Sequence, residues 1–186
     1  MRRPALTLAL GLALVALVAR ADDLASYRSP ALPSSRAGIV FTIGHPGDWA
    51  VAWGGERTRF YPPDASEGPL SAATFVHVDA IARDEAGVDG LLSDKGGLET
   101  WVGATRPRWE IEDRRRAKVG ATDETREALL VKDPAHGTEP DRRELVVLVP
   151  AGDVNFLVRC SAPLAEFSRR DGLFRAILHS FQPSGG

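Results

Sequence analysis

The sequence predicts an α+β domain built on an antiparallel sheet with two helices laid against it. Residues 145–149 are apolar at every position, as expected of a strand covered on both faces. After a short turn at 150–153, residues 154–161 alternate as in a second strand. The apolar face of that strand would hold Val154, Phe156, Val158 and Cys160. Residues 163–181 then place their apolar side chains on one stripe of a helix, which must be buried.

The first 21 residues are predicted to be a signal peptide. Arg2 and Arg3 give it a positive start, and residues 5–19 form an apolar run too short to span a bilayer comfortably. Ala19-Arg20-Ala21 supplies the small residues of a cleavage site. An uncleaved membrane anchor is the alternative interpretation. We expect an exported protein, periplasmic or secreted, with no membrane span after cleavage.

The charge balance argues against nucleic acid as a partner. The chain has 23 Lys and Arg residues against 25 Asp and Glu, and cleavage takes away three arginines and no acid, so the net charge changes from −2 to −5. A mildly acidic domain has no electrostatic attraction to nucleic acid. Cys160 is the only cysteine, which excludes an intrachain disulfide. We expect a monomer stabilised by its core.

The amino-terminal half reads as an arm followed by short strands. Residues 22–37 contain two prolines and four serines without a sustained apolar period, which predicts a linker or disordered arm. The domain itself would cover residues 38–183. Turn residues such as Gly54-Gly55 separate its first predicted strands. These strands are residues 38–43, 49–53, 57–61 and 74–82.

The middle of the chain is predicted to form a helix and two further strands. Residues 88–102 carry a helical apolar stripe, but Gly90, Gly96 and Gly97 each cost a helix about 1 kcal/mol relative to Ala. The helix must therefore depend on tertiary packing. Residues 108–119 resemble a solvated strand near a sheet edge, and residues 127–132 form another strand.

Several packing motifs are similar to those of a known family. The opening strand runs into Pro46-Gly47-Asp48-Trp49, similar to a P-x-x-W entry, and residues 177–181 end the last helix on an apolar-x-x-Ser-Phe pattern. Together with the mid-chain helix, these features resemble the PsbP-like fold family. That family includes the photosystem II protein PsbP, exported bacterial proteins of unknown function and a Ran-binding nuclear import factor.

The resemblance covers about residues 38–183. It implies an α/β/α sandwich around a central antiparallel sheet of about six or seven strands, with one mid-chain and one C-terminal helix. Family members serve mostly as binding or assembly modules, and no residue role is carried over from them. The leader has no thylakoid-style context, which argues against a photosystem role.

Motifs for covalent catalysis do not emerge from the sequence. It contains no Gly-x-Ser-x-Gly pattern, and Cys160 is expected in the core. No two histidines have the spacing of a zinc site. His77 on a strand and His179 in the last turn of a helix are interpreted as structural. We expect no cofactor.

The polar loop 133–143 is the one candidate metal site. Carboxylates and a histidine in this loop could gather a hard cation such as calcium, although their spacing matches no EF-hand. An ordinary exposed loop is the alternative. The candidate ligands are Asp133, His136, Glu139 and Asp141.

Aromatic residues concentrate in the first strands, where they more often form core than a ligand groove. They are Trp49, Trp53, Phe60 and Tyr61. The sequence therefore predicts an exported, non-enzymatic binding or assembly module that acts on a protein partner in the cell envelope. The alternative is a small-ligand or metal-ion binding protein that uses a sheet–helix pocket or the 133–143 loop. A hydrolase with an unrecognised site is a third hypothesis.

Overall fold

A computed structural model describes residues 24–63, 74–84, 87, 89–93, 96–122, 124–134 and 140–185. Within them, the main sheet has seven antiparallel strands in the order β3-β4-β5-β9-β8-β7-β6. The strands are β3 (Ala50–Trp53), β4 (Arg57–Tyr61), β5 (Phe75–Ala82), β6 (Glu110–Val119), β7 (Glu124–Asp133), β8 (Arg142–Ala151) and β9 (Val154–Pro163). A smaller sheet, in the order β1-β2-β10, contains β1 (Leu24–Arg28), β2 (Val40–Pro46) and β10 (Gln182–Ser184).

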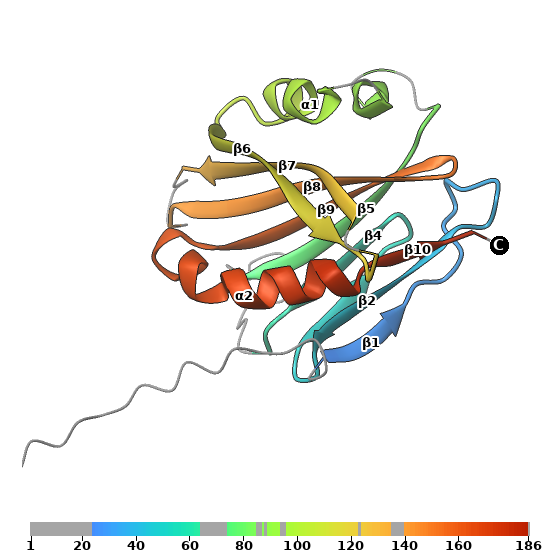
Figure 1. The fold of residues 1–186 in the computed structure, drawn as a ribbon, viewed down its shortest axis with the longest axis horizontal. Coiled ribbons are helices and arrows are strands. Elements are labelled where there is room, and N and C mark those ends of the chain that lie inside the picture. Colours follow the sequence, from blue (N-terminus) through green and yellow to red (C-terminus); the bar gives the residue numbers. More distant parts are fainter. Residues whose placement is uncertain are drawn as a thin grey trace, which may run out of the picture.

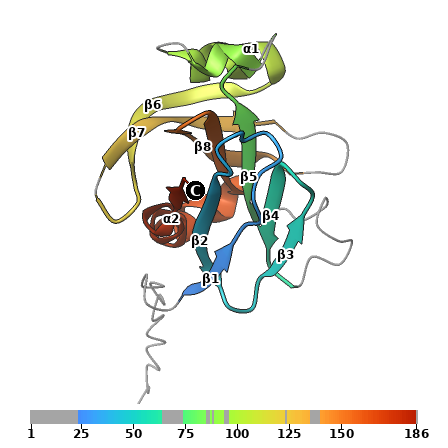
Figure 2. The same cartoon turned by 90° about the vertical axis from the view of Figure 1, so that its right-hand side faces the viewer.

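Two α-helices lie on opposite faces of the main sheet, α1 (Gly97–Thr105) on one and α2 (Leu164–Ser180) on the other (Figure 1). Figure 2 shows that the sheet curves around α2 and strands β1 and β2, while α1 lies outside. The predicted α+β class, the antiparallel sheet and the presence of one mid-chain and one C-terminal helix are confirmed.

The larger core lies between the main sheet, α2 and the small sheet. It contains the predicted apolar face of β9, namely Val154, Phe156, Val158 and Cys160. The stripe on α2 faces this core with Phe167, Phe174, Ile177 and Leu178. A second cluster packs α1 against the other face of the sheet through side chains such as Leu98, Trp101 and Leu157.

The Ser-Phe ending of α2 fastens the helix to the small sheet. The Ser180 hydroxyl accepts a hydrogen bond from the Gly44 N–H at 2.7 Å and donates one to the Ile177 carbonyl at 2.6 Å. A Cβ atom on Gly44 would lie 3.0 Å from Ser180 Oγ and 2.9 Å from the Leu24 side chain. Glycine at position 44 thus permits the close approach of helix, β1 and β2.

The arm predicted over residues 22–37 differs in the structure, because Leu24–Arg28 form β1 on the edge of the small sheet. This strand pairs antiparallel with β2, from Leu24 opposite Pro46 to Arg28 opposite Thr42. Leu32 is also buried in the core. The local pattern is too short and polar to predict a strand whose partner lies farther along the chain. The predicted signal peptide, residues 1–21, lies outside the described residues, within which no helix is sufficiently long and apolar to span a membrane.

The helix predicted over 88–102 is wrong in its extent. The structure has a 3₁₀ helix, η2 (Asp89–Ser93), and then α1. Gly96, the residue before α1, has a left-handed backbone conformation with φ 75°. Gly97 packs so closely on η2 that an added Cβ atom would lie 1.9 Å from the Leu91 carbonyl oxygen. The glycines that weaken one continuous helix therefore permit a tight turn between two short ones.

Gly97→Ala is expected to lower the free energy of unfolding by about 1–3 kcal/mol, because the new methyl group must push α1 away from η2. Gly103→Ala, in the same helix, should instead raise it by about 0.4–1 kcal/mol, since a Cβ atom there meets nothing within 4 Å. Urea unfolding of both variants checks this pair. Equal effects of the two substitutions would contradict the close approach at Gly97.

Candidate functional site

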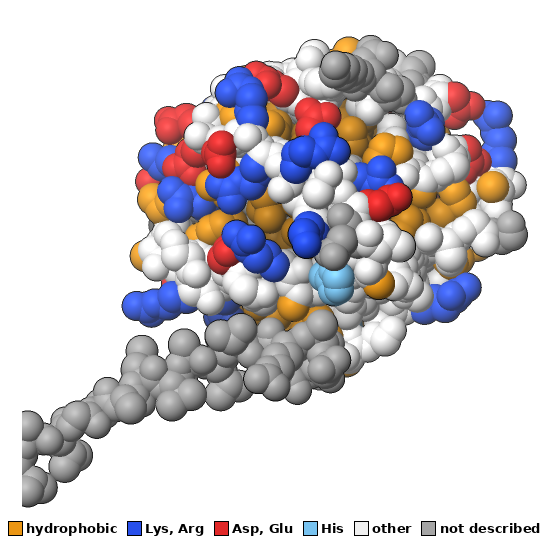
Figure 3. Space-filling model, viewed as in Figure 1, with side chains coloured by type: hydrophobic (Ala, Val, Ile, Leu, Met, Phe, Trp, Pro, Cys, Tyr) orange, Lys and Arg blue, Asp and Glu red, His pale blue; other side chains and the backbone are white. Residues whose placement is uncertain are grey.

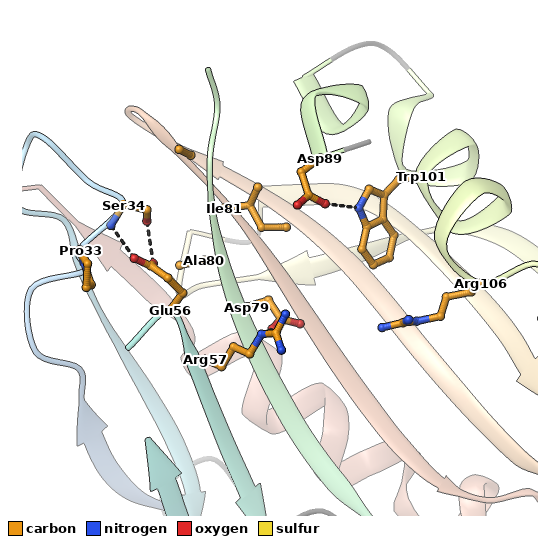
Figure 4. A pocket seen from close by; sticks show the side chains of 11 residues that line it. Pro33, Ser34, Glu56, Arg57, Asp79, Ala80, Ile81, Asp89, Trp101 and Arg106 are labelled. Atoms are coloured by element: carbon orange, nitrogen blue, oxygen red, sulfur yellow. Dashed lines mark hydrogen bonds and ion pairs between the residues drawn. The ribbon is translucent and has the colours of Figure 1, made fainter. Parts of the chain in front are cut away.

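The face of the main sheet that carries α1 changes from apolar to polar along its strands. Side chains of β5 and β9 directed to this face include Ile81 and Leu157, which pack in the α1 cluster, and also His77, Asp79 and Arg159. A cleft of about 450 Å³ opens between β4, β5 and the η2–α1 segment (Figure 4). Its lining includes Glu56, Arg57, Asp79, Asp89, Trp101 and Arg106.

Hydrogen bonds fix two acidic side chains at the rim. Glu56, in the turn before β4, accepts from the Ser34 N–H at 2.6 Å and from the Ser34 hydroxyl at 2.7 Å. Asp89 in η2 accepts from the Trp101 indole N–H at 2.8 Å, which holds η2 against α1. Both carboxylates are thus engaged with the scaffold that shapes the cleft.

Two arginines extend over the cleft from different elements. Arg57 comes from β4 and has a side chain 75% exposed. Arg106, just after α1, places its guanidinium carbon 5.9 Å from the centre of the Trp101 ring and 5.5 Å from that of Trp109. Both guanidinium groups point toward Asp79 in Figure 4. An anionic or carbonyl group entering the cleft would meet hydrogen-bond donors from two sides.

Asp79 lies at the floor of the cleft and links it to a buried charge network. Its carboxylate is 3.3 Å from Arg57 Nε, 3.5 Å from His77 Nε2 and 3.8 Å from Arg159 Nε. Burial raises the pKa of Asp79, and the nearby arginines oppose that rise. The neighbouring side chains therefore hold the Asp79 carboxylate in place, although burial makes its charged form less favourable.

Arg159 is the centre of this network. It donates from Nη2 to His77 Nδ1 at 2.5 Å, and its Nη1 lies 3.8 Å from Glu144 Oε2. Glu144 is 2% exposed, and burial raises its pKa. On the outer side, the Arg59 guanidinium carbon lies 3.9 Å above the Phe75 ring. The charged network therefore extends from Asp79 in the cleft through Arg159 to the buried Glu144.

The environment keeps His77 neutral. Burial, together with the positive charges of Arg159, Arg59 and Arg57, lowers its pKa to about 3. Since Arg159 donates to Nδ1, the ring proton resides on Nε2, toward Asp79. The basic lone pair of the ring is thus occupied, which makes His77 a structural bridge unsuited to accepting a proton from a substrate.

The free energy of unfolding should depend on pH through His77. Because the pKa is lowered in the folded state, the unfolded chain binds more protons between pH 6.5 and about 3, and stability falls as the pH drops through that window. The raised pKa values of Asp79 and Glu144 have the opposite effect, since the folded chain then binds more protons and stability rises as the pH drops. Urea titrations of the wild type and His77→Gln isolate the histidine.

We expect the free energy of unfolding of the wild type, relative to that of His77→Gln, to fall by up to about 1.4 kcal/mol for each unit by which the pH is lowered within that window. A difference between the two proteins that is constant with pH would contradict the neutral, buried ring.

The predicted metal ligands are only partly placed. Asp133 ends β7, and Asp141 precedes β8 with its carboxylate 3.4 Å from the Lys132 ammonium group. His136 and Glu139 lie outside the described residues. Within the described part of the chain, no three His, Cys, Asp or Glu side chains gather as a metal site would require.

Other predicted residues take structural positions. Cys160 is fully buried among apolar side chains, and burial raises the pKa of its thiol. Trp49 and Phe60 lie in the core, but Trp53 on the edge strand β3 is 50% exposed. His179 occupies the last turn of α2, as predicted.

The residues of the cleft could not be predicted from the sequence, because they come from five separate segments. The one available signal was the placement of charged residues at alternate positions, Arg57 with Arg59 and His77 with Asp79, on otherwise strand-like segments. Such alternation predicts a shared polar face.

Comparisons with solved structures identify the fold. The chain aligns with yeast (Saccharomyces cerevisiae) Ran-binding protein Mog1p at a TM-score of 0.52 and 12% identity, over 86% of this chain and 95% of that one. It aligns with cyanobacterial PsbP (CyanoP) of Synechocystis at 0.51 and 13% identity, over 94% and 96%. The expected PsbP-like fold is confirmed, and the chain has the Mog1/PsbP-like fold.

A protein from Bacteroides thetaiotaomicron also aligns, with a TM-score of 0.50 and 12% identity over 87% of this chain. The chain spans about half the length of that protein, 49%. No protein-family model and no curated protein sequence matches the chain. At these identities, the similarity shows the fold alone.

Proposed function

We propose that the protein is an exported, non-enzymatic binding module that holds a protein partner in the cell envelope through the cleft beside α1. The observation that carries this proposal is the pair of exposed guanidinium groups, Arg57 and Arg106, directed into one cleft from two elements. Arginine recognises carboxylates through paired hydrogen bonds, so the contacting group of the partner is an acidic side chain or a terminal carboxylate.

The chemistry around the cleft supports binding over turnover. His77, whose Nε2 lies 3.5 Å from the Asp79 carboxylate at the floor of the cleft, has its lone pair engaged by Arg159. The carboxylates of Glu56 and Asp89 accept hydrogen bonds from the scaffold. Export is supported by the predicted signal peptide, and binding of a partner agrees with the description of Mog1p, which has the same fold, as a Ran-binding protein.

Affinity recovery from an envelope extract tests the proposal. The baits are the full chain, the cleft variant Arg57→Gln/Arg106→Gln and the matched control Arg108→Gln/Arg169→Gln, which removes two exposed arginines elsewhere. We expect a protein enriched by the wild type and the control but recovered about tenfold less by the cleft variant, because charge-assisted hydrogen bonds are lost. Equal recovery by all three baits would refute the cleft as the binding site.

A small carboxylate ligand is the second candidate. The cleft volume of about 450 Å³ lies in the range of small-molecule sites, and Trp101 and Ile81 add apolar surface to its lining. NMR titration with benzoate distinguishes this candidate. Shifts confined to the cleft and abolished in Arg57→Gln/Arg106→Gln would favour a small ligand, and an unchanged spectrum would argue against it.

A further inference from the structure

A second hollow lies on the opposite face of the main sheet, between β6 and α2. It has a volume of about 530 Å³. Its apolar lining comes from Ala117, Leu145 and Leu178, and its polar lining from Arg115, Arg116, Lys118, Thr125, Asp171, Arg175 and His179. We call this hollow the basic groove. In Figure 3, Lys and Arg side chains surround a strip of hydrophobic surface in the region of β6 and α2.

The topology makes this hollow a groove that is closed at one end. Strand β6 and helix α2 converge at their carboxyl-terminal ends, where the Gly120 N–H donates to the Leu178 carbonyl at 3.1 Å. Away from this junction, the floor of the groove lies between β6 and α2, and Leu145 of β8 forms part of it. The groove therefore has a strand as one wall, a helix as the other and an apolar base.

The charge of the groove is opposite in sign to that of the protein. Four Lys and Arg residues line it against one acid, Asp171, whereas the whole chain carries a net charge of −2. Asp171 is paired with Arg175 at 2.7 Å, and Asp113 lies 2.8 Å from Arg115. Counting Asp113 as well, the cations exceed the acids by two. Such a local excess attracts an anionic partner.

The surfaces of these cations are accessible. The Arg175 side chain is 70% exposed and that of Arg115 is 33% exposed. Ion pairs at such exposure contribute little to stability, at most about 1 kcal/mol each, so these arginines are not explained by a need to hold the fold together. An incoming carboxylate could share or replace their present partners.

We propose that the basic groove binds an extended, acidic segment of a partner protein, with one apolar side chain of that segment on the floor. The concave shape favours a peptide over a bilayer, because a flat membrane surface cannot reach a floor between a strand and a helix. The described lining contains no Phe, Tyr or Trp ring on which a nucleotide base could stack. Acidic side chains flanking an apolar one match cationic walls above an apolar base.

The basic groove and the cleft beside α1 lie on opposite faces of the sheet, so the protein can bind two segments at once. Two working sites would make the module an assembly factor, which extends the proposed function, whereas peptide binding by the basic groove alone does not depend on the cleft.

Fluorescence polarisation with the full chain tests the groove. The probe is a labelled synthetic peptide of Asp and Glu residues around a central Leu, and the reference peptides carry either Ser in place of Leu or Asn and Gln in place of the acids. We expect saturable binding of the acidic Leu peptide that weakens as salt is raised. Both reference peptides should bind about tenfold more weakly or worse.

Variants locate the site. Arg115→Gln/Arg175→Gln should weaken binding by about tenfold or more, because two charge-assisted contacts are lost. Arg169→Gln, on α2 but outside the groove, is the matched control and should bind as the wild type. Ala117→Phe fills the floor and should abolish binding, with circular dichroism confirming that the variant is folded.

Failure of this proposal can be told apart from failure of the cleft. Arg57→Gln/Arg106→Gln should leave peptide affinity unchanged. The proposal is overturned if the acidic Leu peptide does not bind, if Arg169→Gln weakens binding as much as Arg115→Gln/Arg175→Gln, or if anionic vesicles bind the chain through these arginines while the peptide does not.

Discussion

Replacing Arg159 by methionine should lower the free energy of unfolding by about 3–5 kcal/mol. The side chain is 10% exposed and lies within ion-pair distance of both Asp79 and Glu144. Removing it leaves two buried acids without their shared positive charge, and it takes away the donor to His77 Nδ1. The measurement is urea unfolding of both proteins at neutral pH.

The pH dependence gives this prediction a second readout. Burial already raises the pKa of Glu144 and Asp79, and loss of Arg159 removes a charge that opposes this rise. The folded variant therefore binds protons more readily than the unfolded chain, so its deficit should shrink as the pH is lowered. Arg175→Met, at an exposed site, is the control and should change stability by no more than about 0.5 kcal/mol. A deficit below 1 kcal/mol for Arg159→Met would show that the network does not stabilise the sheet.

Phe181→Ala should also lower the free energy of unfolding by about 3–5 kcal/mol, owing to the cavity left by a fully buried ring. The Phe181 ring lies 5.5 Å from that of Phe41 on β2 and 5.3 Å from that of Phe156 on β9. One side chain thus joins the end of α2 to both sheets. Thermal or urea unfolding of the variant measures the loss.

Trp53→Ala is the matched control, because it deletes a large aromatic side chain that is half exposed on an edge strand. It should change stability by no more than about 0.5 kcal/mol. Comparable losses at positions 53 and 181 would mean that the three-phenylalanine contact does not hold the two sheets together.

The periodic placement of apolar residues predicts which side chains of a strand or helix are buried. The alternation in β9 and the stripe on α2 assign their side chains to the correct core, because burial on one side imposes a fixed period on the sequence. The Ser180-Phe181 ending was recognised as a motif, and the structure explains it through the bond to Gly44 and the buried ring.

Features created by long-range pairing could not be predicted. Strand β1 is held by β2, and His77 meets Arg159 because β5 pairs with β9, where the two residues lie opposite each other. No local period reports which strands become neighbours. The prediction of one continuous helix over 88–102 is wrong for a different reason. The close packing of Gly97 on η2 is a tertiary contact, which the helical period of the sequence does not report.

Site-specific photocrosslinking tests the central claim, that the cleft beside α1 is a surface for contact with a protein partner. A photoreactive phenylalanine derivative is placed at Pro33, an exposed residue of the cleft lining, in the full chain, with the same group at Arg169 on α2 as the control. We expect one defined protein adduct from position 33 that disappears when Arg57 and Arg106 are also changed to Gln, and no such adduct from position 169. The same adducts from both positions, or none from position 33, would contradict the claim.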